Sequence, residues 1–236
     1  MPEERCLSRS GDKRAKELRE AHLQRVARNE SRVSTLWARH CQAYNVHIQL
    51  ARRSQATLGQ IQKSLKREEP NLLVCPEQTL HVSVAWLLAV HASYSVSKDV
   101  LWERHGQEWR TELRRIAAQS AAFRISYGHV VATDSAVVAL AEPTGPVNRI
   151  RRMIQDRLRL PPETRNEADL VHTTLFRFGG ALHDPARFLA ALENTRVEVA
   201  VEVEELVVSK ELVYPSLQTE VLERLPLGRN IWPNFA

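Results

Sequence analysis

Two short segments, far apart in the chain, carry the same order of side chains. Residues 81–84 (HVSV) and 172–175 (HTTL) each place a histidine, then any residue, then a hydroxyl residue, then an aliphatic residue. Each segment lies in an apolar stretch, 80–88 and 170–178, that is typical of a β-strand. Because residues i and i+2 of a strand point to one face, each histidine lies beside its hydroxyl neighbour. The fold must therefore contain two similar strands, each with a polar pair on a face that is free to line a cleft.

The segments around these two strands predict an α+β fold. We expect further strands over residues 44–51, 123–131, 135–140, 197–203, 206–209 and 220–225. We expect helices over residues 54–67, 99–119, 145–158 and 185–192, with Asp99 and Asp184 at the start of two of them. The elements do not follow a regular βαβ rhythm, which favours mainly antiparallel sheets. One unit, made of a strand, a helix and a histidine-bearing strand, occurs twice.

The N-terminal part of the chain differs from the rest in pattern and in charge. Residues 12–43 contain no Pro or Gly, so we expect one long helix with a narrow apolar stripe. The apolar residues that recur at roughly helical spacing are Leu18, Val26, Val33, Leu36 and Trp37. Residues 1–70 hold 15 Lys and Arg against 8 Asp and Glu, and the remainder holds 18 against 20. This basic excess favours a polyanionic partner, although a solvated helix face is the alternative.

Several classes of protein are disfavoured by what the sequence lacks. The longest apolar run, residues 82–90, is too short to span a bilayer, and we expect no membrane partner. The N-terminus is charged from its first residues, which predicts a cytoplasmic protein. No GxGxxG, P-loop or GxSxG motif occurs, which argues against dinucleotide enzymes, P-loop kinases and α/β-hydrolases. No carboxylate-rich or HxH segment suggests a metal site, and we expect no cofactor.

The pairing of histidine with a hydroxyl residue suits in-line displacement at phosphorus. Such a reaction needs a base on the attacking oxygen and an acid on the leaving oxygen, on opposite sides. An unperturbed imidazole pKa of about 6.5 lets one histidine be neutral and another be protonated near neutral pH. Two hydroxyls can donate hydrogen bonds to the non-bridging oxygens. The pattern therefore predicts His81 and His172 as an acid–base pair, with Ser83 and Thr174 binding the phosphate.

These motifs and the sequence around them resemble the two-histidine (2H) phosphoesterase superfamily, most closely its bacterial 2'-5' RNA ligase-like and cyclic phosphodiesterase branch. Residues 76–87 (PEQTLHVSVAWL) are similar to the segment that runs through the first motif of that family. Residues 172–177 (HTTLFR) are similar to its second motif, and residues 206–227 to its closing strand pair. The resemblance covers residues 44–228. It implies a bilobal fold of two mainly antiparallel sheets flanked by helices, with pseudo-twofold symmetry and one motif in each lobe.

The resemblance also implies a substrate and a division of the chain. The family is known for opening 2',3'-cyclic phosphates at RNA or nucleotide termini, so we expect an RNA or nucleotide phosphodiester as substrate. Ser83 stands where threonine is commoner, but it retains the hydroxyl donor. The expected parts are a basic N-terminal helical extension (1–43), the phosphoesterase domain (44–228) and a C-terminal tail (229–236). Nothing in the sequence indicates an oligomeric state.

Two neighbouring residues of the second motif have opposing interpretations. The resemblance implies that Arg177 binds the phosphate, but regular alternation from His172 puts Phe176 on the cleft face instead. Arg177 reaches that face only if the strand ends or bulges before it. With regular alternation, Phe176 could stack on a nucleobase.

Two other functions stay open on sequence alone. One is a catalytically silent RNA-binding module of the same fold, in which the basic helix supplies affinity. The other is a phosphodiesterase for a cyclic dinucleotide or an ADP-ribose derivative. The paired imidazoles favour an enzyme, because a pure binding module needs no titratable pair. Seven further histidines lack an equivalent motif, and we expect none to be catalytic: His22, His40, His47, His91, His105, His129 and His183.

Overall fold

The computed structural model describes residues 20, 22–164, 166 and 170–228. Its strands are β1 (His40–Gln49), β2 (Leu72–Val74), β3 (His81–Leu88), β4 (Phe123–Ala132), β5 (Ala136–Glu142), β6 (His172–Phe178), β7 (Arg196–Val203), β8 (Glu205–Val213) and β9 (Gln218–Pro226). Its helices are α2 (Arg52–Glu68), α3 (Lys98–Gln119), α4 (Gly145–Arg157) and α5 (Pro185–Asn194), with a 3-10 turn at Glu77–Thr79. Every strand and helix predicted between residues 44 and 228 has a counterpart here. Only the short β2 and the 3-10 turn were not expected.

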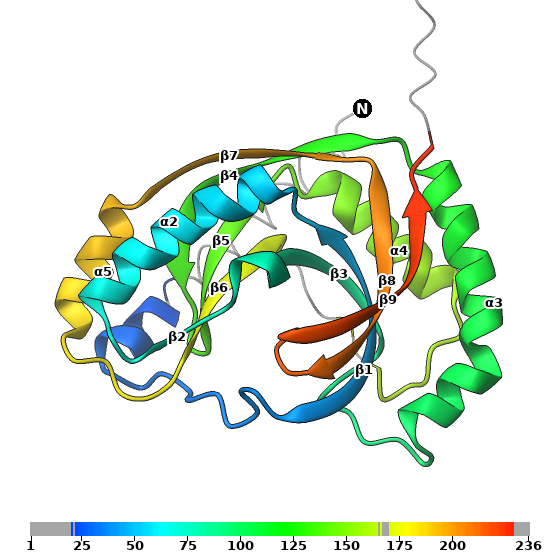
Figure 1. Cartoon of the computed structure of the whole chain (residues 1–236), viewed down its shortest axis with the longest axis horizontal. Helices are drawn as coiled ribbons and strands as arrows, with labels where there is room; N and C mark the ends of the chain where they lie inside the picture. The colour runs from blue at the N-terminus through cyan, green and yellow to red at the C-terminus, as the bar shows by residue number, and fades with distance from the viewer. Residues whose placement is uncertain (1–19, 21, 165, 167–169, 229–236) are drawn as a thin grey trace, which may run out of the picture.

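The strands form two antiparallel sheets (Figure 1). The first has four strands in the order β3-β1-β8-β9, and the second has five in the order β2-β6-β5-β4-β7. Helices α3 and α4 pack on the first sheet, and α2 and α5 pack on the second. One continuous apolar core runs through both lobes. None of the helices described is long and apolar enough to cross a membrane.

The repeated unit is present as β1-α2-β3 and as β5-α4-β6, and its helices are exchanged between the lobes. Helix α2 lies in the chain between β1 and β3 of the first sheet, with the short β2 after it, but it packs on β7, β6 and β2 of the second. Helix α4 connects two strands of the second sheet but packs on β3 and α3. The order β3-β1-β8-β9 therefore has its counterpart in β6-β5-β4-β7, with the histidine-bearing strand first in each. The exchange makes the two lobes a single packed unit.

The long N-terminal helix predicted over residues 12–43 is wrong beyond residue 27, and residues 12–19 and 21 of it lie outside the described residues. Residues 22–27 are helical, and the backbone then turns at Asn29, whose φ of 59° is left-handed. Asn29 forms two hydrogen bonds with the backbone of Leu182, from Nδ2 at 3.0 Å and to Oδ1 at 2.8 Å. Strand β1 begins at His40, inside the predicted helix. Contacts with distant segments therefore override the local helical pattern.

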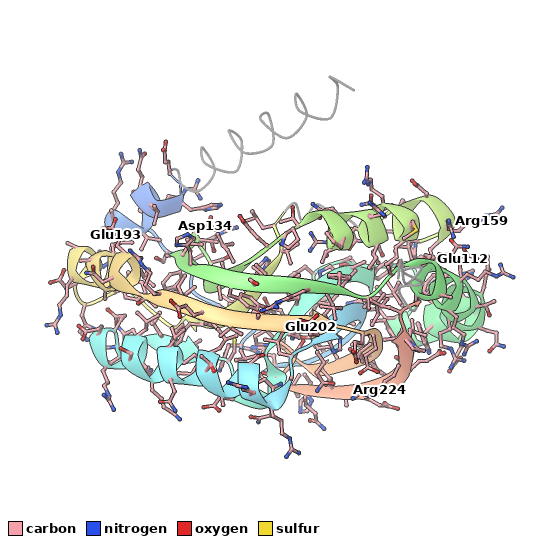
Figure 2. The ribbon with its side chains drawn as sticks, turned by 90° about the horizontal axis from the view of Figure 1, so that it is seen from above. Glu112, Asp134, Arg159, Glu193, Glu202 and Arg224 are labelled. Atoms are coloured by element: carbon pink, nitrogen blue, oxygen red, sulfur yellow. The ribbon has the colours of Figure 1, made fainter. Side chains whose placement is uncertain are left out.

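Asp134, at the tip of the β4–β5 turn, holds the N-terminal segment against the second sheet (Figure 2). Its buried carboxylate binds Arg25 at 3.1 Å and Arg32 at 2.8 Å, and His22 lies 3.5 Å away. Burial alone would raise the pKa of Asp134. The neighbouring cations, among which Arg32 has the largest effect, hold this pKa below its ordinary value. Part of the basic charge seen in the sequence is therefore paired inside the molecule.

The start of α3 differs from the prediction. Ser97, not Asp99, caps the helix, because its hydroxyl accepts a hydrogen bond from the Val100 amide at 3.3 Å. Asp99 instead accepts a hydrogen bond from the Tyr44 hydroxyl at 2.6 Å and pairs with Lys210 at 2.8 Å. The carboxylate thus ties α3 to β1 and β8. Asp184, by contrast, caps α5 as expected.

Candidate active site

The two histidine-bearing strands, β3 and β6, contact each other between the sheets. In both strands the histidine and the hydroxyl residue are partly exposed, whereas the residues next to them are buried. Each polar pair therefore shares one face of its strand, as the alternation predicted. Charge on His81 lowers the pKa of His172, so the two rings lie within electrostatic range of each other. The structure thus brings both motifs to one place.

Each of these strands has a β-bulge directly after the hydroxyl residue. In β3, Ser83 and Ala85 pair with consecutive residues of β1, so Val84 is the extra residue. In β6, residues 174 and 176 pair with consecutive residues of β5, so Leu175 is the extra residue. A bulge shifts the alternation of side chains by one position. The residue five places after each histidine, Trp86 or Arg177, is therefore partly exposed again.

The bulge in β6 decides between Arg177 and Phe176. Phe176 is 0% exposed in the core, so the prediction that it stacks on a nucleobase is wrong. Arg177 returns to the face of His172, and its guanidinium lies 5.7 Å from the centre of the Tyr214 ring. Among the described residues, no hydrogen-bond acceptor reaches its buried Nε. An unpaired guanidinium donor on the same strand face as the His172 imidazole is well suited to an anion.

His81 is oriented by its own backbone. Its Nδ1 lies 2.8 Å from the carbonyl oxygen of Thr79, and a carbonyl only accepts, so Nδ1 carries the proton in the neutral ring. Nε2 then carries the lone pair and accepts from the Ser83 hydroxyl at 3.2 Å. Burial lowers the pKa of His81, and the Thr79 carbonyl opposes this shift. The resting ring is neutral at pH 7, with its acceptor beside the hydroxyl.

His172 is more strongly perturbed. Burial lowers the pKa of His172 to about 4; the carbonyl of Leu170 opposes the shift, and the charges of Arg151, Arg177 and His81 add to it. Although that carbonyl lies nearby, Nδ1 of His172 makes no well-formed hydrogen bond with the described residues. Both imidazoles are therefore neutral in the empty site at pH 7. A bound anion would raise both pKa values, because it favours the protonated ring.

A buried arginine of α4 holds the bulge of the first motif. Arg151, 7% exposed, donates from Nε to the Val84 carbonyl at 3.0 Å and from Nη2 to the Ser83 carbonyl at 2.9 Å. Nη2 also lies 3.2 Å from the carbonyl of Leu170, just before the second motif strand. One guanidinium thus fixes the backbone of both motifs.

A buried glutamine of α2 holds the bulge of the second motif. Gln62, 2% exposed, donates from Nε2 to the Leu175 carbonyl at 2.8 Å and to the Cys75 carbonyl at 2.7 Å. Val84 and Leu175 are the extra residues of the two bulges, so the pseudo-twofold relation extends to these contacts. Gln62 and Arg151 were not predicted from the sequence. The sequence feature that could have identified them is a polar residue on the otherwise apolar, buried face of an amphipathic helix.

A third histidine, which was not expected at the site, lies beside the pair. The ring of His47 in β1 lies edge-on to that of His81, with 5.1 Å between the ring centres. Its Nδ1 is 3.1 Å from Oδ1 of Asn45 and 3.3 Å from the hydroxyl of Ser209. Burial lowers the pKa of His47 well below its ordinary value, and the charges of His81 and Arg224 add to this. The pairing of β1 with β3 brings His47 here, which no local motif indicates.

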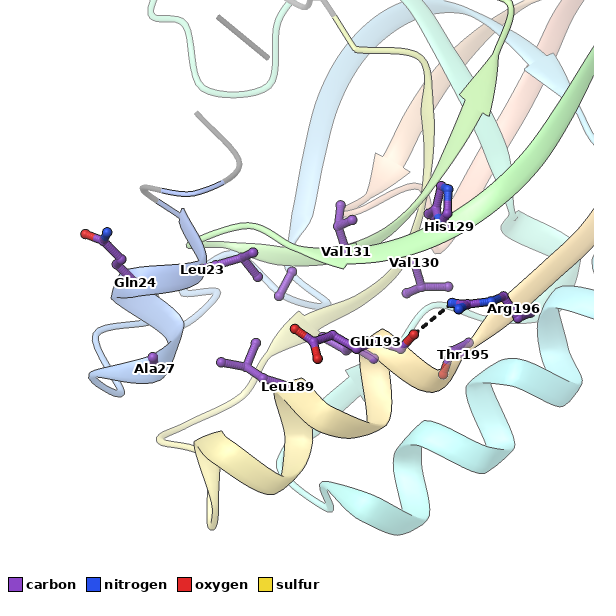
Figure 3. Close-up of a pocket in the computed structure, with 12 residues that line it drawn as sticks. Leu23, Gln24, Ala27, His129, Val130, Val131, Leu189, Glu193, Thr195 and Arg196 are labelled. Carbon is purple, nitrogen blue, oxygen red and sulfur yellow. Dashed lines mark hydrogen bonds between the residues drawn. The ribbon is translucent and has the colours of Figure 1, made fainter. Parts of the chain in front are cut away.

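One pocket of the described structure lies away from the two motifs. It has a volume of about 450 Å³ and lies between the N-terminal segment, β4 and α5, where Leu23, Val130 and Leu189 line it (Figure 3). None of the motif residues reaches it. Within the residues that the structure describes, no group of three or more His, Cys, Asp or Glu side chains is placed to hold a metal ion.

Neither a protein-family model nor a curated protein sequence matches the chain. Solved structures do match. TT0787 of Thermus thermophilus has a TM-score of 0.57 and 17% identity, over 80% of this chain and 99% of that one. LigT of E. coli complexed with 3'-AMP has a TM-score of 0.57 and 14% identity, over 80% and 99%. A structure described as a phosphoesterase has a TM-score of 0.56 and 14% identity, over 79% and 99%. At these identities the match shows a shared fold, which extends over nearly the whole of those chains.

Proposed function

We propose that this chain, which has the α+β fold of the two-histidine phosphoesterases, is a phosphodiesterase with His81 and His172 as its acid–base pair. The observation that carries the proposal is the pair of half-buried imidazoles on contacting strands, each with a hydroxyl neighbour on the same face. One imidazole can take a proton from the attacking water while the other gives a proton to the leaving oxygen, and these transfers need no metal ion. A cytoplasmic location is part of the proposal.

The proposed substrate is an RNA or nucleotide phosphodiester, and in particular a 2',3'-cyclic phosphate terminus. The fold neighbour LigT of E. coli has been solved with phosphate and with 3'-AMP, which supports a substrate of the nucleotide class. Arg177 supports it as well, because its unpaired Nε lies on the histidine face, where an anionic phosphodiester would satisfy it.

In the proposed reaction the hydroxyls of Ser83 and Thr174, with Arg177, bind the non-bridging oxygens. One neutral imidazole removes a proton from water as its oxygen attacks phosphorus. The other imidazole, protonated, gives its proton to the leaving sugar oxygen on the opposite side. The low pKa of His172 suits the first role, and the charge of the bound phosphodiester would help the second ring to hold its proton.

A panel of substrates tests the proposal. It should contain nucleoside 2',3'-cyclic phosphates, RNA with a cyclic phosphate end, a 2'-5'-linked dinucleotide, a cyclic dinucleotide and an ADP-ribose phosphodiester, each with and without excess EDTA. We expect hydrolysis of cyclic phosphate termini that EDTA does not reduce. Complete loss of activity in EDTA, restored by zinc or manganese, would contradict the mechanism. RNA binding without turnover of any substrate would instead indicate a silent binding module.

A further inference from the structure

A second pocket, of about 300 Å³, opens beside His81. Its walls come from β1, the start of β3 with the 3-10 turn before it, and the turn between β8 and β9 with the start of β9. Three amide side chains, Gln49, Gln78 and Gln218, line it, and Leu217 and Val221 add apolar surface. The pocket adjoins the reacting centre, because His81 lines it, whereas Ser83, His172 and Thr174 are not among its lining residues.

The lining of this pocket carries no formally charged side chain. Arg224, which contacts the lining residue Gln49, donates to its Oε1 at 3.0 Å and pairs with Glu205. A second phosphate would therefore find no free cation among the lining residues. Amides next to apolar side chains suit a neutral ligand that has both a flat apolar surface and polar edges. A nucleoside has these properties.

His47 gives the pocket a directed acceptor. The Ser209 hydroxyl donates to Oδ1 of Asn45 at 2.9 Å, which identifies Oδ1 as an acceptor for Nδ1–H of His47 as well. The neutral ring then has its lone pair on Nε2. All hydrogen bonds of the His47 ring with the described residues involve Nδ1, so Nε2 is available to a ligand.

The turn that forms the far wall is held by hydrogen bonds within the protein. Its residue Ser216 donates its backbone N–H to the carboxylate of Glu211 at 2.6 Å, and Glu211 is 0% exposed. The amide of Leu217 donates to the carbonyl of Val213 at 2.8 Å. A preformed wall lowers the ordering cost of binding.

We propose that this pocket is the nucleoside subsite, in which Nε2 of His47 accepts a hydrogen bond from an O–H or N–H group of the nucleoside. The inference rests on the proposed function and deepens it. With the nucleoside on this side of the phosphorus, the leaving sugar oxygen faces His81. His172 then takes the proton of the attacking water, the bond from phosphorus to the sugar oxygen breaks as the bond to the water oxygen forms, and His81 protonates the sugar oxygen.

Two substrates with the same reacting ring test the subsite. Adenosine 2',3'-cyclic phosphate has a nucleoside, and ethylene phosphate is a five-membered cyclic phosphodiester without one. For His47→Ala and Gln218→Ala we expect KM for the adenosine substrate to rise about 3- to 10-fold, as for the loss of one hydrogen bond. Gln218→Ala should not alter KM for ethylene phosphate, and His47→Ala, whose ring contacts His81, should raise KM for ethylene phosphate less than KM for the adenosine substrate. Equal effects on both substrates, or no effect on the adenosine substrate, would overturn the proposal.

Two controls guard against indirect effects. Gln218 is exposed, so Gln218→Ala tests the pocket without disturbing the core. Gln24→Ala is the same substitution in the larger pocket of Figure 3, and it should change neither KM.

Binding measurements separate this proposal from the proposed function. Calorimetric titration with adenosine 3'-monophosphate and with inorganic phosphate needs no turnover. We expect the nucleotide to bind more tightly than phosphate, Gln218→Ala to weaken only the nucleotide, and His47→Ala to weaken the nucleotide more than phosphate. If no cyclic phosphate is hydrolysed but this pattern holds, the proposed function fails and the subsite stands. If the nucleotide binds no more tightly than phosphate, the subsite is refuted whatever the activity.

Discussion

Burial of the two histidines limits the pH range in which they can work as an acid–base pair. The pKa of His172 is lowered to about 4, and that of His81 is lowered from 6.5. The reactive free protein has one ring neutral and the other protonated, and this form is most abundant between the two pKa values. We therefore expect a bell-shaped plot of kcat/KM against pH, which rises near pH 4 and has its maximum below about pH 6.5. A maximum above pH 7 would show that burial does not control the pair.

The buried carboxyl group of Glu211 predicts how the stability of the fold depends on pH. Burial raises the pKa of Glu211 to about 7, and its Oε2 has no partner among the described residues. The folded protein therefore holds this proton more tightly than the unfolded chain, and stability falls as pH rises from about 4.5 to 7. Glu211→Gln mimics the protonated form while its Oε1 can still accept from Ser216.

We expect Glu211→Gln to increase the free energy of unfolding at pH 8 by on the order of 1–3 kcal/mol. At pH 5 the change should be small, because the native carboxyl is then already neutral. Glu220→Gln, the same change at an exposed position, should have little effect at either pH. Denaturant unfolding at the two pH values measures this, and an equal effect of Glu211→Gln at both would refute the role of the charge.

At the scale of elements, α4 holds the bulge in β3 and α2 holds the bulge in β6. Substitutions at these two contacts form a matched pair of variants. Arg151 of α4 holds the β3 bulge and lowers the pKa of His172 by its charge, whereas Gln62 of α2 holds the β6 bulge without charge. Arg151→Met should therefore raise the pKa of His172 and move the acidic limb of the pH–rate profile to higher pH. Gln62→Leu should not move it.

Arg151→Lys separates geometry from charge. It keeps the cation but cannot reproduce the three contacts with carbonyl oxygens, so the acidic limb should stay near its native position while kcat falls. Arg151→Met and Gln62→Leu should each destabilise the fold by about 1–3 kcal/mol, because buried carbonyls lose their donors. An unchanged acidic limb in a folded Arg151→Met protein would contradict the electrostatic coupling.

Features that depend on local sequence patterns could be predicted, whereas features that depend on contacts between distant segments could not. The motif strands and helices α2 to α5 follow from local alternation and helical periodicity, which is why their predicted positions are close to those observed. The bulges at Val84 and Leu175 depend on pairing with other strands, so the sequence left Arg177 and Phe176 unresolved. His47 joins the site only through the pairing of β1 with β3. The N-terminal helix ends early because of contacts with distant residues, and local periodicity does not report these.

At the scale of the whole molecule, the exchanged helices predict cooperative unfolding. Each sheet is covered by the helix of the repeated unit that belongs to the other sheet, and a continuous core runs through both. We expect a single transition in denaturant, with coincident curves from near-UV and far-UV circular dichroism. Two separated transitions would show that the lobes fold independently and that the exchange contributes little to their coupling.

The central claim is that His81 and His172 perform acid–base catalysis as a unit. Its most direct test is the turnover of adenosine 2',3'-cyclic phosphate in excess EDTA by the native protein, His81→Ala, His172→Ala and the double variant. Each single change should reduce turnover by about 10²- to 10⁴-fold, and the double variant should be far less than multiplicatively worse. Ser83→Ala and Thr174→Ala should cost about 10- to 10³-fold, since each removes one donor. If either histidine variant is folded, by circular dichroism, and keeps near-native turnover, the account is wrong.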